Sequence, residues 1–417
     1  MGSIREVMRG NLLVFTIGDV LRQLSMFITF PYFSLYVQAL GGSVVDIGIV
    51  NSLRPLTALF LYPIAGYLSD RYSRIKIITI TGLAGSLLWF VFVFARDWRW
   101  LAIGNLLLGM MTFYFPAANS LMAESLPKDK RALGYSMWQA IPMAAGILSP
   151  LAGGYLISLW GVEAAMRFLY GLTLVIGLLI AGMNYRYLRE DERELPTDNL
   201  DLLGVLVKSY REVIEVVLWL PRNLKAFGVM LVLGFFFNSM VSSYWVIYVV
   251  QIIGLFEVQW GLVLLIASVA NVLLLLPAGM VVDRFGPKRL LTIVLILGSV
   301  PILAFAYIQS FYGIILILIL VTIANSFLMA GAPAYMAKAT PLDKRGRIMS
   351  ALGQGMLLIN TRGGGVGGPG MGAVLTIPTI AGSLLGGVVY NFNPQLLWLS
   401  FGLAMLCSAV IGWLFLE

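Results

Sequence analysis

Four ionisable side chains lie inside long apolar stretches of this sequence, where a charge is expensive to bury. They are Asp19, Arg22, Arg54 and Arg362. A charged group at the centre of a bilayer costs at least about 2.5–3.5 kcal/mol, so each one is a functional hypothesis. Together they supply one carboxylate and three cations. Such a positive interior suits an anionic or zwitterionic headgroup, or acids contributed by other segments.

Asp19 and Arg22 are three residues apart, so on a helix they share a face with Met26 and Thr29 and can pair. The chain has no histidine, so any proton chemistry must use carboxylates. One interpretation makes Asp19 a protonation switch, in which neutralisation releases Arg22 and changes which side of the bundle opens. The other makes the two residues a fixed structural ion pair.

The remaining intramembrane arginines are less constrained by the sequence. Arg54 stands beside Asn51 and just before Pro55, and it could face a cavity or bridge to the carbonyls of another helix or to Asp46. Arg362 lies about midway along the eleventh apolar segment. In contrast, Glu163, Arg167 and Glu257 fall near helix ends, where we expect them to be solvated.

The composition identifies the elements that must position these groups. The 417 residues are 59% hydrophobic and 12% charged, with a mean hydropathy of +0.90, which excludes a soluble fold and predicts an all-α, multi-pass membrane protein. The one cysteine, Cys407, offers neither a disulfide nor a metal pair, and we expect no cofactor. The net charge of +8 lies in short clusters between apolar segments, which indicates membrane topology rather than nucleic-acid binding.

Breaks at charges, at glycine and proline clusters and at polar turns predict twelve spans. They cover residues 11–38, 45–69, 76–95, 99–123, 132–159, 164–187, 224–252, 258–281, 289–309, 311–337, 347–390 and 395–416. A polar stretch from Arg186 to Asn223 separates six spans from six and carries an amphipathic pattern from Leu202 to Leu220. We therefore expect helix bundles at 1–188 and 223–417 and a linker with a surface helix at 189–222.

Orientation follows from lysine and arginine, which stay on the cytoplasmic side. With the N-terminus inside, most of them fall in cytoplasmic segments, and the outer loops hold only Arg96, Arg99 and Arg167. The sequence therefore predicts that both termini lie in the cytoplasm.

Two motifs repeat at about half the length of the chain. GYLSDRYSRIK at 66–76 matches GMVVDRFGPKR at 279–289, and LPKDKRA at 126–132 matches TPLDKRG at 340–346. The first pair is offset by 213 positions and the second by 214. Repetition of this kind predicts two six-helix halves with the same membrane orientation.

These motifs resemble the major facilitator superfamily, whose signature between the second and third helices reads G-x-L-x-D-R-x-G-R-[RK]. The resemblance covers nearly the whole chain and implies a transporter fold. It assigns a gating role to one set of residues: Gly66, Asp70, Arg71, Arg74, Glu124, Gly279, Asp283 and Arg284. In that role Gly66 lets two helices approach closely, and Arg71 pairs with Glu124 at the end of the fourth helix.

The fifth span resembles the export-associated G-x-x-x-G-P-x-x-G-G pattern of drug/proton antiporters. Pro150, Gly153 and Gly154 match it, and Gly146 lies one position after its first glycine; small residues at about this spacing let helices pack closely. The fourth span departs from the antiporter pattern, because Asn105 stands where an arginine is common. That departure weakens the assignment of proton antiport.

Helices one, four, seven and ten line the centre in the family the sequence resembles. With one residue added from helix five, the expected cavity residues are Met26, Arg54, Asn105, Phe113, Asn119, Gln139, Asn238, Tyr244, Trp245, Asn325, Met329 and Arg362. Such side chains can instead be core or lipid-facing.

The eleventh segment contains an insertion of about 19 residues relative to the repeat, because Gly153 and Gly154 align with Gly386 and Gly387 at an offset of 233. INTRGGGVGGPGMG at 359–372 cannot form a stable continuous helix. We expect a broken helix that lines the cavity with Arg362 at its tip, a loop outside the membrane, or two short spans.

The sequence therefore predicts a monomeric, proton-coupled exporter of amphipathic or hydrophobic small molecules in the cell membrane, with Asp19 and Arg22 as the coupling pair. The nearest alternative is uptake or exchange of an organic anion that the arginines bind. A non-transporting receptor or scaffold on the same fold is a third possibility. An enzyme is not expected, because no G-x-S-x-G, P-loop or metal-binding set is present.

Overall fold

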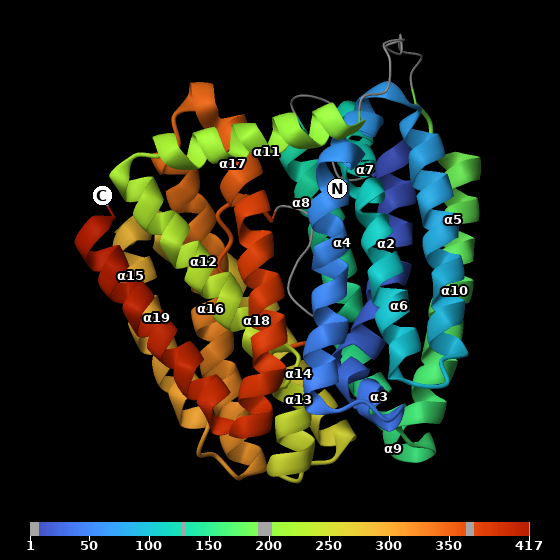
Figure 1. The fold of residues 1–417 in the computed structure, drawn as a ribbon, viewed down its shortest axis with the longest axis vertical. Coiled ribbons are helices and arrows are strands. Elements are labelled where there is room, and N and C mark those ends of the chain that lie inside the picture. The colour runs from blue at the N-terminus through green and yellow to red at the C-terminus, as the bar shows by residue number, and fades with distance from the viewer. Residues whose placement is uncertain (1–7, 127–129, 191–201, 364–370, 417) are drawn as a thin grey trace.

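The structure is a computed structural model that describes residues 8–126, 130–190, 202–363 and 371–416. Within these ranges every regular element is helical, and twelve helices are long and apolar enough to cross a membrane. Two bundles stand side by side, with the N-terminal half in blue to green and the C-terminal half in yellow to red (Figure 1). The predicted all-α fold with twelve spans is confirmed.

The N-terminal half contains six spans, several of which are interrupted by a short 3₁₀ turn. Their helices are α2 (Gly10–Thr29) with α3 (Phe33–Ala39), α4 (Val44–Arg71), α5 (Arg74–Val93), α6 (Trp98–Leu108) with α7 (Tyr114–Ser125), α8 (Arg131–Ala145) with α9 (Ser149–Trp160), and α10 (Val162–Tyr187).

The C-terminal half follows the surface helix α11 (Leu202–Trp219). Its helices are α12 (Arg222–Ser242) with α13 (Trp245–Ile247) and the π turn η4 (Tyr248–Ile252), α14 (Glu257–Phe285), α15 (Pro287–Phe305), α16 (Phe311–Ala339), α17 (Arg345–Leu352), α18 (Ala373–Phe392) and α19 (Gln395–Phe415). The eleventh segment is therefore not the single span predicted at 347–390. α17 is too short to cross a bilayer, which also rules out two separate spans there.

Local sequence explains where the helices begin and turn. Ser43 and Asp46 form a reciprocal capping box at the start of α4, in which the Ser43 amide donates to Asp46 at 2.8 Å. Asp46 is thus occupied by a cap and does not bridge to Arg54. At the other end of the bundle, Gly286 connects α14 to α15 with φ of 84°, a conformation that favours glycine.

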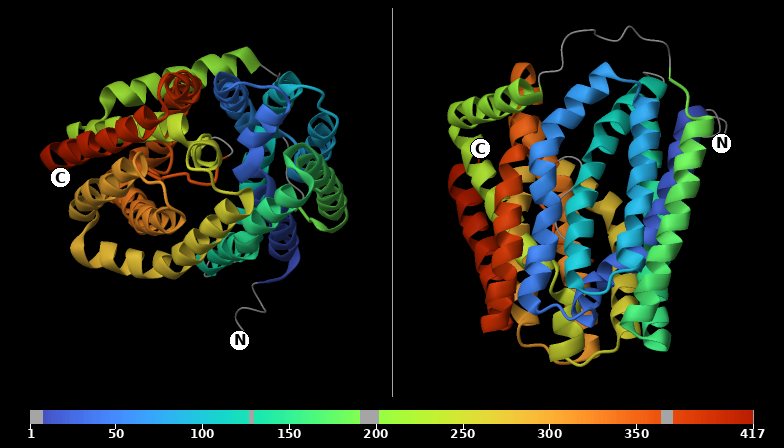
Figure 2. Two further views of the ribbon diagram at one scale, coloured as in Figure 1. Left: turned by 90° about the horizontal axis from the view of Figure 1, so that it is seen from below. Right: turned by 45° about the vertical axis from the view of Figure 1, so that its right-hand side comes forward.

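The two ends of the bundle are named here by the helices they hold. The α13 end contains α3, α13 and the first residues of α4 and α14, and the α11 end lies opposite (Figure 1). Between the halves, α4 packs against α18 and α9 packs against α14. Viewed along the bundle, the halves form two adjoining groups of helices (Figure 2).

Helix α11 crosses the α11 end and touches both halves. The Tyr210 hydroxyl donates to the Leu59 carbonyl of α4, and the Lys344 ammonium lies 3.3 Å from the centre of the Trp219 ring. Burial raises the pKa of Tyr210, so its hydroxyl stays protonated at neutral pH.

Arg167 ties a loop at the α13 end, contrary to the expectation that it is simply solvated. Its guanidinium donates to the carbonyls of Val93 at 2.9 Å and Ala95 at 2.6 Å, and it also pairs with Glu163. One side chain thus holds the turn between α5 and α6 against α10.

We predict that Arg167→Ala lowers the free energy of unfolding by about 2 kcal/mol, because hydrogen bonds to a charged group are lost. The measurement is unfolding of the purified protein in detergent. Arg99→Ala is the matched control, since the described bond of Arg99 to Asp97 uses its backbone amide. Equal stability of the two variants would contradict the assignment.

Candidate functional site

Asp19 lies at the centre of a polar cluster within the N-terminal half. Its carboxylate pairs with Arg22 and accepts a hydrogen bond from the Trp138 indole at 2.6 Å. The Arg22 guanidinium lies 5.0 Å from the centre of the Tyr114 ring. Helices α2, α7 and α8 thus meet around one carboxylate, whose side chain is only 14% exposed.

This cluster is chemically distinctive within the described helices. Each other carboxylate of a span lies within three residues of a helix end, whereas Asp19 is ten residues into α2. That places it about 14 Å along the helix from Gly10. Both partners of Asp19 donate to its ionised form. Protonation would therefore remove the charge that holds Arg22 and leave at most one good acceptor for two donors.

The sequence pairs Asp19 with Arg22 but does not reveal Trp138 or Tyr114. Both are aromatic residues in spans rich in aromatic residues, so nothing in their local pattern sets them apart. Four of the expected cavity residues are close in sequence to members of this cluster. Met26 and Phe113 are half-buried, whereas Gln139 and Asn119 are exposed. The spacing of residues in the sequence does not separate the half-buried positions from the exposed ones.

The gating motif forms a second cluster at the α11 end. Glu124 pairs with Arg74, not with Arg71 as the resemblance implies. The Arg71 guanidinium lies 4.4 Å from the centre of the Tyr67 ring. Arg74 is buried because it starts α5 beneath the end of α7, whereas Arg71 ends α4 one turn earlier.

Glu190 is a participant that the sequence does not reveal. Its carboxylate accepts from the Ser73 hydroxyl at 2.8 Å and from the Arg74 amide at 3.1 Å. It thereby caps the start of α5, where a negative charge complements the free amides and the helix dipole. A cap contributed from the far end of the half, 116 positions away, cannot be read from local spacing.

The close helix approach expected at Gly66 is absent from this structure. A Cβ added at Gly66, or at its repeat partner Gly279, would meet no atom within 4 Å. Asp70, Asp283 and Arg284 are exposed. The motif glycines at the α11 end are therefore unpacked.

The motif glycines of the fifth span, unlike Gly66 and Gly279, are closely packed. A Cβ at Gly153 would collide with the Ile28 carbonyl, and one at Gly154 with the Glu257 carbonyl of the other half. Gly146 is similarly packed against Phe27, and the Pro150 carbonyl accepts from the Tyr32 hydroxyl. The α13 end is thus tightly closed, at glycines that the sequence singles out.

The interrupted eleventh span sends the 353–363 segment between the halves. The Asn325 side chain accepts from the Ile359 amide at 2.8 Å, and the Asn238 side chain accepts from the Asn360 amide at 2.9 Å. Asn325 lies at the middle of α16, so the segment is at membrane depth and not a loop outside it. Residues 364–370 of the predicted insertion lie outside the described residues.

Arg362 is carried by this segment to the seam between the halves. Its guanidinium donates to the Ser268 hydroxyl at 3.1 Å and lies 4.6 Å from the centre of the Phe27 ring in α2. Arg54 is half-buried on α4, and its side chain makes no hydrogen bond, ion pair or ring contact with any described residue. Neither arginine has a carboxylate partner in the described chain.

Several expected cavity residues have structural contacts instead. Trp245 is buried in an aromatic cluster, 4.4 Å from Trp398 between ring centres. The Asn105 amide donates to the Val50 carbonyl at 3.3 Å within the N-terminal half, and Tyr244 is fully buried. Met329 accepts a weak hydrogen bond from Asn325. Of the expected set, Asn238 and Asn325 bond to the 353–363 segment, which itself carries Arg362.

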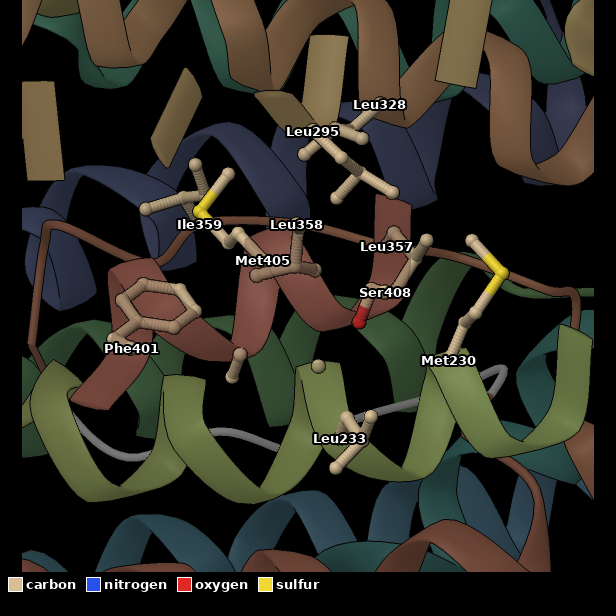
Figure 3. Close-up of a pocket in the computed structure, with 12 residues that line it drawn as sticks. Met230, Leu233, Leu295, Leu328, Leu357, Leu358, Ile359, Phe401, Met405 and Ser408 are labelled. Carbon is tan, nitrogen blue, oxygen red and sulfur yellow. The ribbon is translucent and has the colours of Figure 1, made fainter. Parts of the chain in front are cut away.

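A small apolar pocket lies beside this segment, inside the C-terminal half (Figure 3). Its lining includes Met230, Leu357, Ile359, Phe401 and Met405. The volume of about 20 Å³ is enough for about one water molecule and far below that of a drug-sized site. At this size it is a packing gap, too small to hold a drug-sized molecule.

The sequence and the fold both resemble those of known proteins. A family model described as Major Facilitator Superfamily matches residues 15–356 and 227–417. The chain belongs to the Major Facilitator Superfamily. It is therefore a multi-pass membrane transporter, and membership of this family implies a small-molecule substrate.

Named relatives and solved structures agree with this assignment. The multidrug resistance protein MdtG of Salmonella typhi is 26% identical over 400 residues, which cover 92% of this chain and 95% of that protein. A bacterial homolog of the human lysosomal transporter Spinster, in an inward-facing and occupied conformation, superposes with a TM-score of 0.71 at 15% identity, covering 97% and 95% of the two chains. The nucleoside transporter NupG superposes with a TM-score of 0.67 at 14% identity, covering 97% and 98%. These structures support the fold alone.

We predict that Asn238→Ala and Asn325→Ala each speed hydrogen exchange in the 353–363 segment by about fivefold or more. Each change leaves a segment amide without its acceptor, which costs about 1–3 kcal/mol. Mass spectrometry of that peptide measures the effect. Asn105→Ala, which removes a hydrogen bond elsewhere, is the control. Unchanged exchange in both variants would show that the asparagines do not hold the segment.

Proposed function

We propose that the protein exports amphipathic or hydrophobic small molecules across the cell membrane in exchange for protons, as a monomer with both termini in the cytoplasm. The relatives named multidrug resistance proteins support export of this substrate class. Basic residues gather at the α11 end, which supports the assignment of this end of the bundle to the cytoplasmic face.

The observation that carries proton coupling is the placement of Asp19. It is a nearly buried carboxylate, away from the helix ends, and it is held by Arg22 and Trp138. Neutralising it frees Arg22 and loosens the contact between α2 and α8. A proton can thereby change the relative free energies of two arrangements of the bundle.

Alternating access is supported by the contrast between the two ends. At the α13 end, Gly48, Gly154 and Gly261 are packed against backbone of the opposite half. At the α11 end, Gly66 and Gly279 face open space. This pattern suits a state that is closed outside and accessible from the cytoplasm. In a state with the α11 end closed, Gly66 and Gly279 would pack against the opposite half. The ion pair between Arg74 and Glu124 would then lie within the closed end.

A second candidate function is transport of an organic anion. It is favoured by Arg54 and Arg362, which lie at membrane depth without carboxylate partners, so that the described interior has more positive than negative side chains. A carboxylate or phosphate of the substrate would neutralise this excess and accept the remaining guanidinium donors.

We predict that Asp19→Asn abolishes uptake driven by a pH gradient, lowering it at least tenfold, because the amide cannot bind and release a proton. Uptake of ethidium and rhodamine into inverted membrane vesicles measures it. Glu163→Gln changes an exposed carboxylate near a helix end and should leave uptake unchanged. Full pH-driven uptake by Asp19→Asn would remove Asp19 from the coupling role.

The two substrate classes separate with probes that share one ring system. If the interior selects anions, 2-naphthoate binds at least tenfold more tightly than 2-naphthylmethylammonium or 2-naphthamide, and Arg362→Gln removes the difference. Isothermal titration in detergent measures the affinities, and Arg99→Gln is the control. Tighter binding of the ammonium probe would exclude the anion as cargo.

A further inference from the structure

Two tyrosines occupy equivalent places at the α13 end, one in each half. Tyr32 precedes α3 and Tyr244 precedes α13, and they are 212 positions apart in the sequence, close to the repeat spacing. Their backbones adopt the same conformation, with φ and ψ of −109° and 2° for Tyr32 and −106° and −3° for Tyr244. Both side chains are fully buried.

Each hydroxyl reaches the backbone of the opposite half. Tyr32 contacts the Glu257 carbonyl at 3.3 Å while donating to its own half at the Pro150 carbonyl, at 2.6 Å. Tyr244 donates to the Val44 carbonyl at 2.9 Å. Glu257 is the first residue of α14 and Val44 the first residue of α4, so the two acceptors are also repeat partners.

Glycines make room for each hydroxyl. A Cβ added at Gly154 would lie 2.6 Å from the Tyr32 oxygen, and one at Gly261 would lie 2.8 Å from it. Around Tyr244 the corresponding positions are Gly387, at 3.0 Å, and Gly48, at 3.2 Å. Each tyrosine therefore sits between one glycine of its own half and one of the other half.

The same seam contains a pair that marks the symmetry of the repeat. Gln38 and Gln251 are 213 positions apart, and the Gln251 amide donates to the Gln38 carbonyl oxygen at 2.8 Å. The Ser34 hydroxyl donates to the Ser243 carbonyl at 2.6 Å close by. Residues from equivalent places in the two halves thus meet each other.

We propose that Tyr32 and Tyr244 are gate-positioning residues, two symmetry-related clasps that hold the α13 end closed during transport. Opening this end separates α4 from α18 and α9 from α14, which removes both hydroxyl contacts to the opposite half. Because one clasp lies on each side of the repeat axis, neither half can swing away while both remain bonded. The inference rests on the alternating access in the proposed function.

The chain supplies matched controls from the same repeat. Tyr36 and Tyr248 are also buried and also 212 positions apart. Their hydroxyls donate to Phe92 at 2.7 Å and to Ala306 at 2.9 Å, in each case within one half. Replacing any of the four tyrosines by phenylalanine removes a hydroxyl that donates to a carbonyl, but only two of these hydroxyls contact the other half.

The test measures how often the α13 end opens. With Cys407→Ser as background, Ser34→Cys places a thiol at a seam position that is 2% exposed, and a membrane-impermeant maleimide added from the α13 side labels it only on opening. Tyr244→Phe should raise the labelling rate about fivefold, the factor equivalent to about 1 kcal/mol for one hydrogen bond. Tyr32→Phe should raise it by a smaller factor, above about twofold, because the shorter Tyr32 bond to Pro150 lies within one half and survives opening. The double variant should reach the product of the two single factors if the clasps act independently.

Tyr36→Phe and Tyr248→Phe should leave labelling within twofold, although all four variants lose a similar amount of thermal stability. A disulfide between Gln38→Cys and Gln251→Cys should suppress the added labelling, which separates gate opening from unfolding. Equal labelling in clasp and control variants, or labelling that survives the disulfide, would overturn the proposal. The assay uses neither substrate nor a pH gradient, so its outcome is independent of the proton-coupling test.

Discussion

The structure depends on one constraint: inside hydrocarbon, each backbone and side-chain polar group needs a partner within the protein. The 353–363 segment is irregular backbone at membrane depth, and the side chains of Asn238 and Asn325 satisfy two of its amides. The carboxylate of Asp19 is satisfied by Arg22 and Trp138. Where the halves meet, carbonyls at helix starts accept from tyrosine hydroxyls. Each of these contacts thus gives a buried polar group a specific partner.

The need of buried polar groups for partners also constrains how the two halves can move. A contact that satisfies a buried polar group is costly to break unless another partner or water replaces it. The contacts across the seam are concentrated at the α13 end, whereas the signature glycines at the α11 end face open space. A rocking movement that opens one end to water while closing the other exchanges one set of partners for another. The duplicated fold supplies equivalent elements on each side of the seam for such a movement.

Much of the fold can be predicted from the sequence, because the lengths of the apolar segments and the spacing of the repeated motifs can be read directly from the residues. The number of spans follows from such signals. The glycines of the fifth span are singled out instead by the resemblance to the antiporter pattern, and the structure packs them closely. The candidate site is harder to predict. Asp19 and Arg22 are visible as charges one turn apart, but Trp138 and Glu190 reach their partners across 119 and 116 positions, and no local pattern encodes that distance. Glu124 pairs with Arg74 and not with Arg71 because of where α5 starts relative to the end of α7, which the sequence alone does not give.

The central claim is that the two halves rock about the seam, and spin-label distances test it most directly. Labels at Lys76→Cys and Arg289→Cys report the α11 end, and labels at Phe94→Cys and Tyr307→Cys report the α13 end, with Cys407 replaced in both. All four positions are exposed, and each pair is 213 positions apart in the sequence. On acidification the account predicts that the first distance shortens while the second lengthens. Distances that stay fixed, or that change in the same direction at both ends, would contradict it.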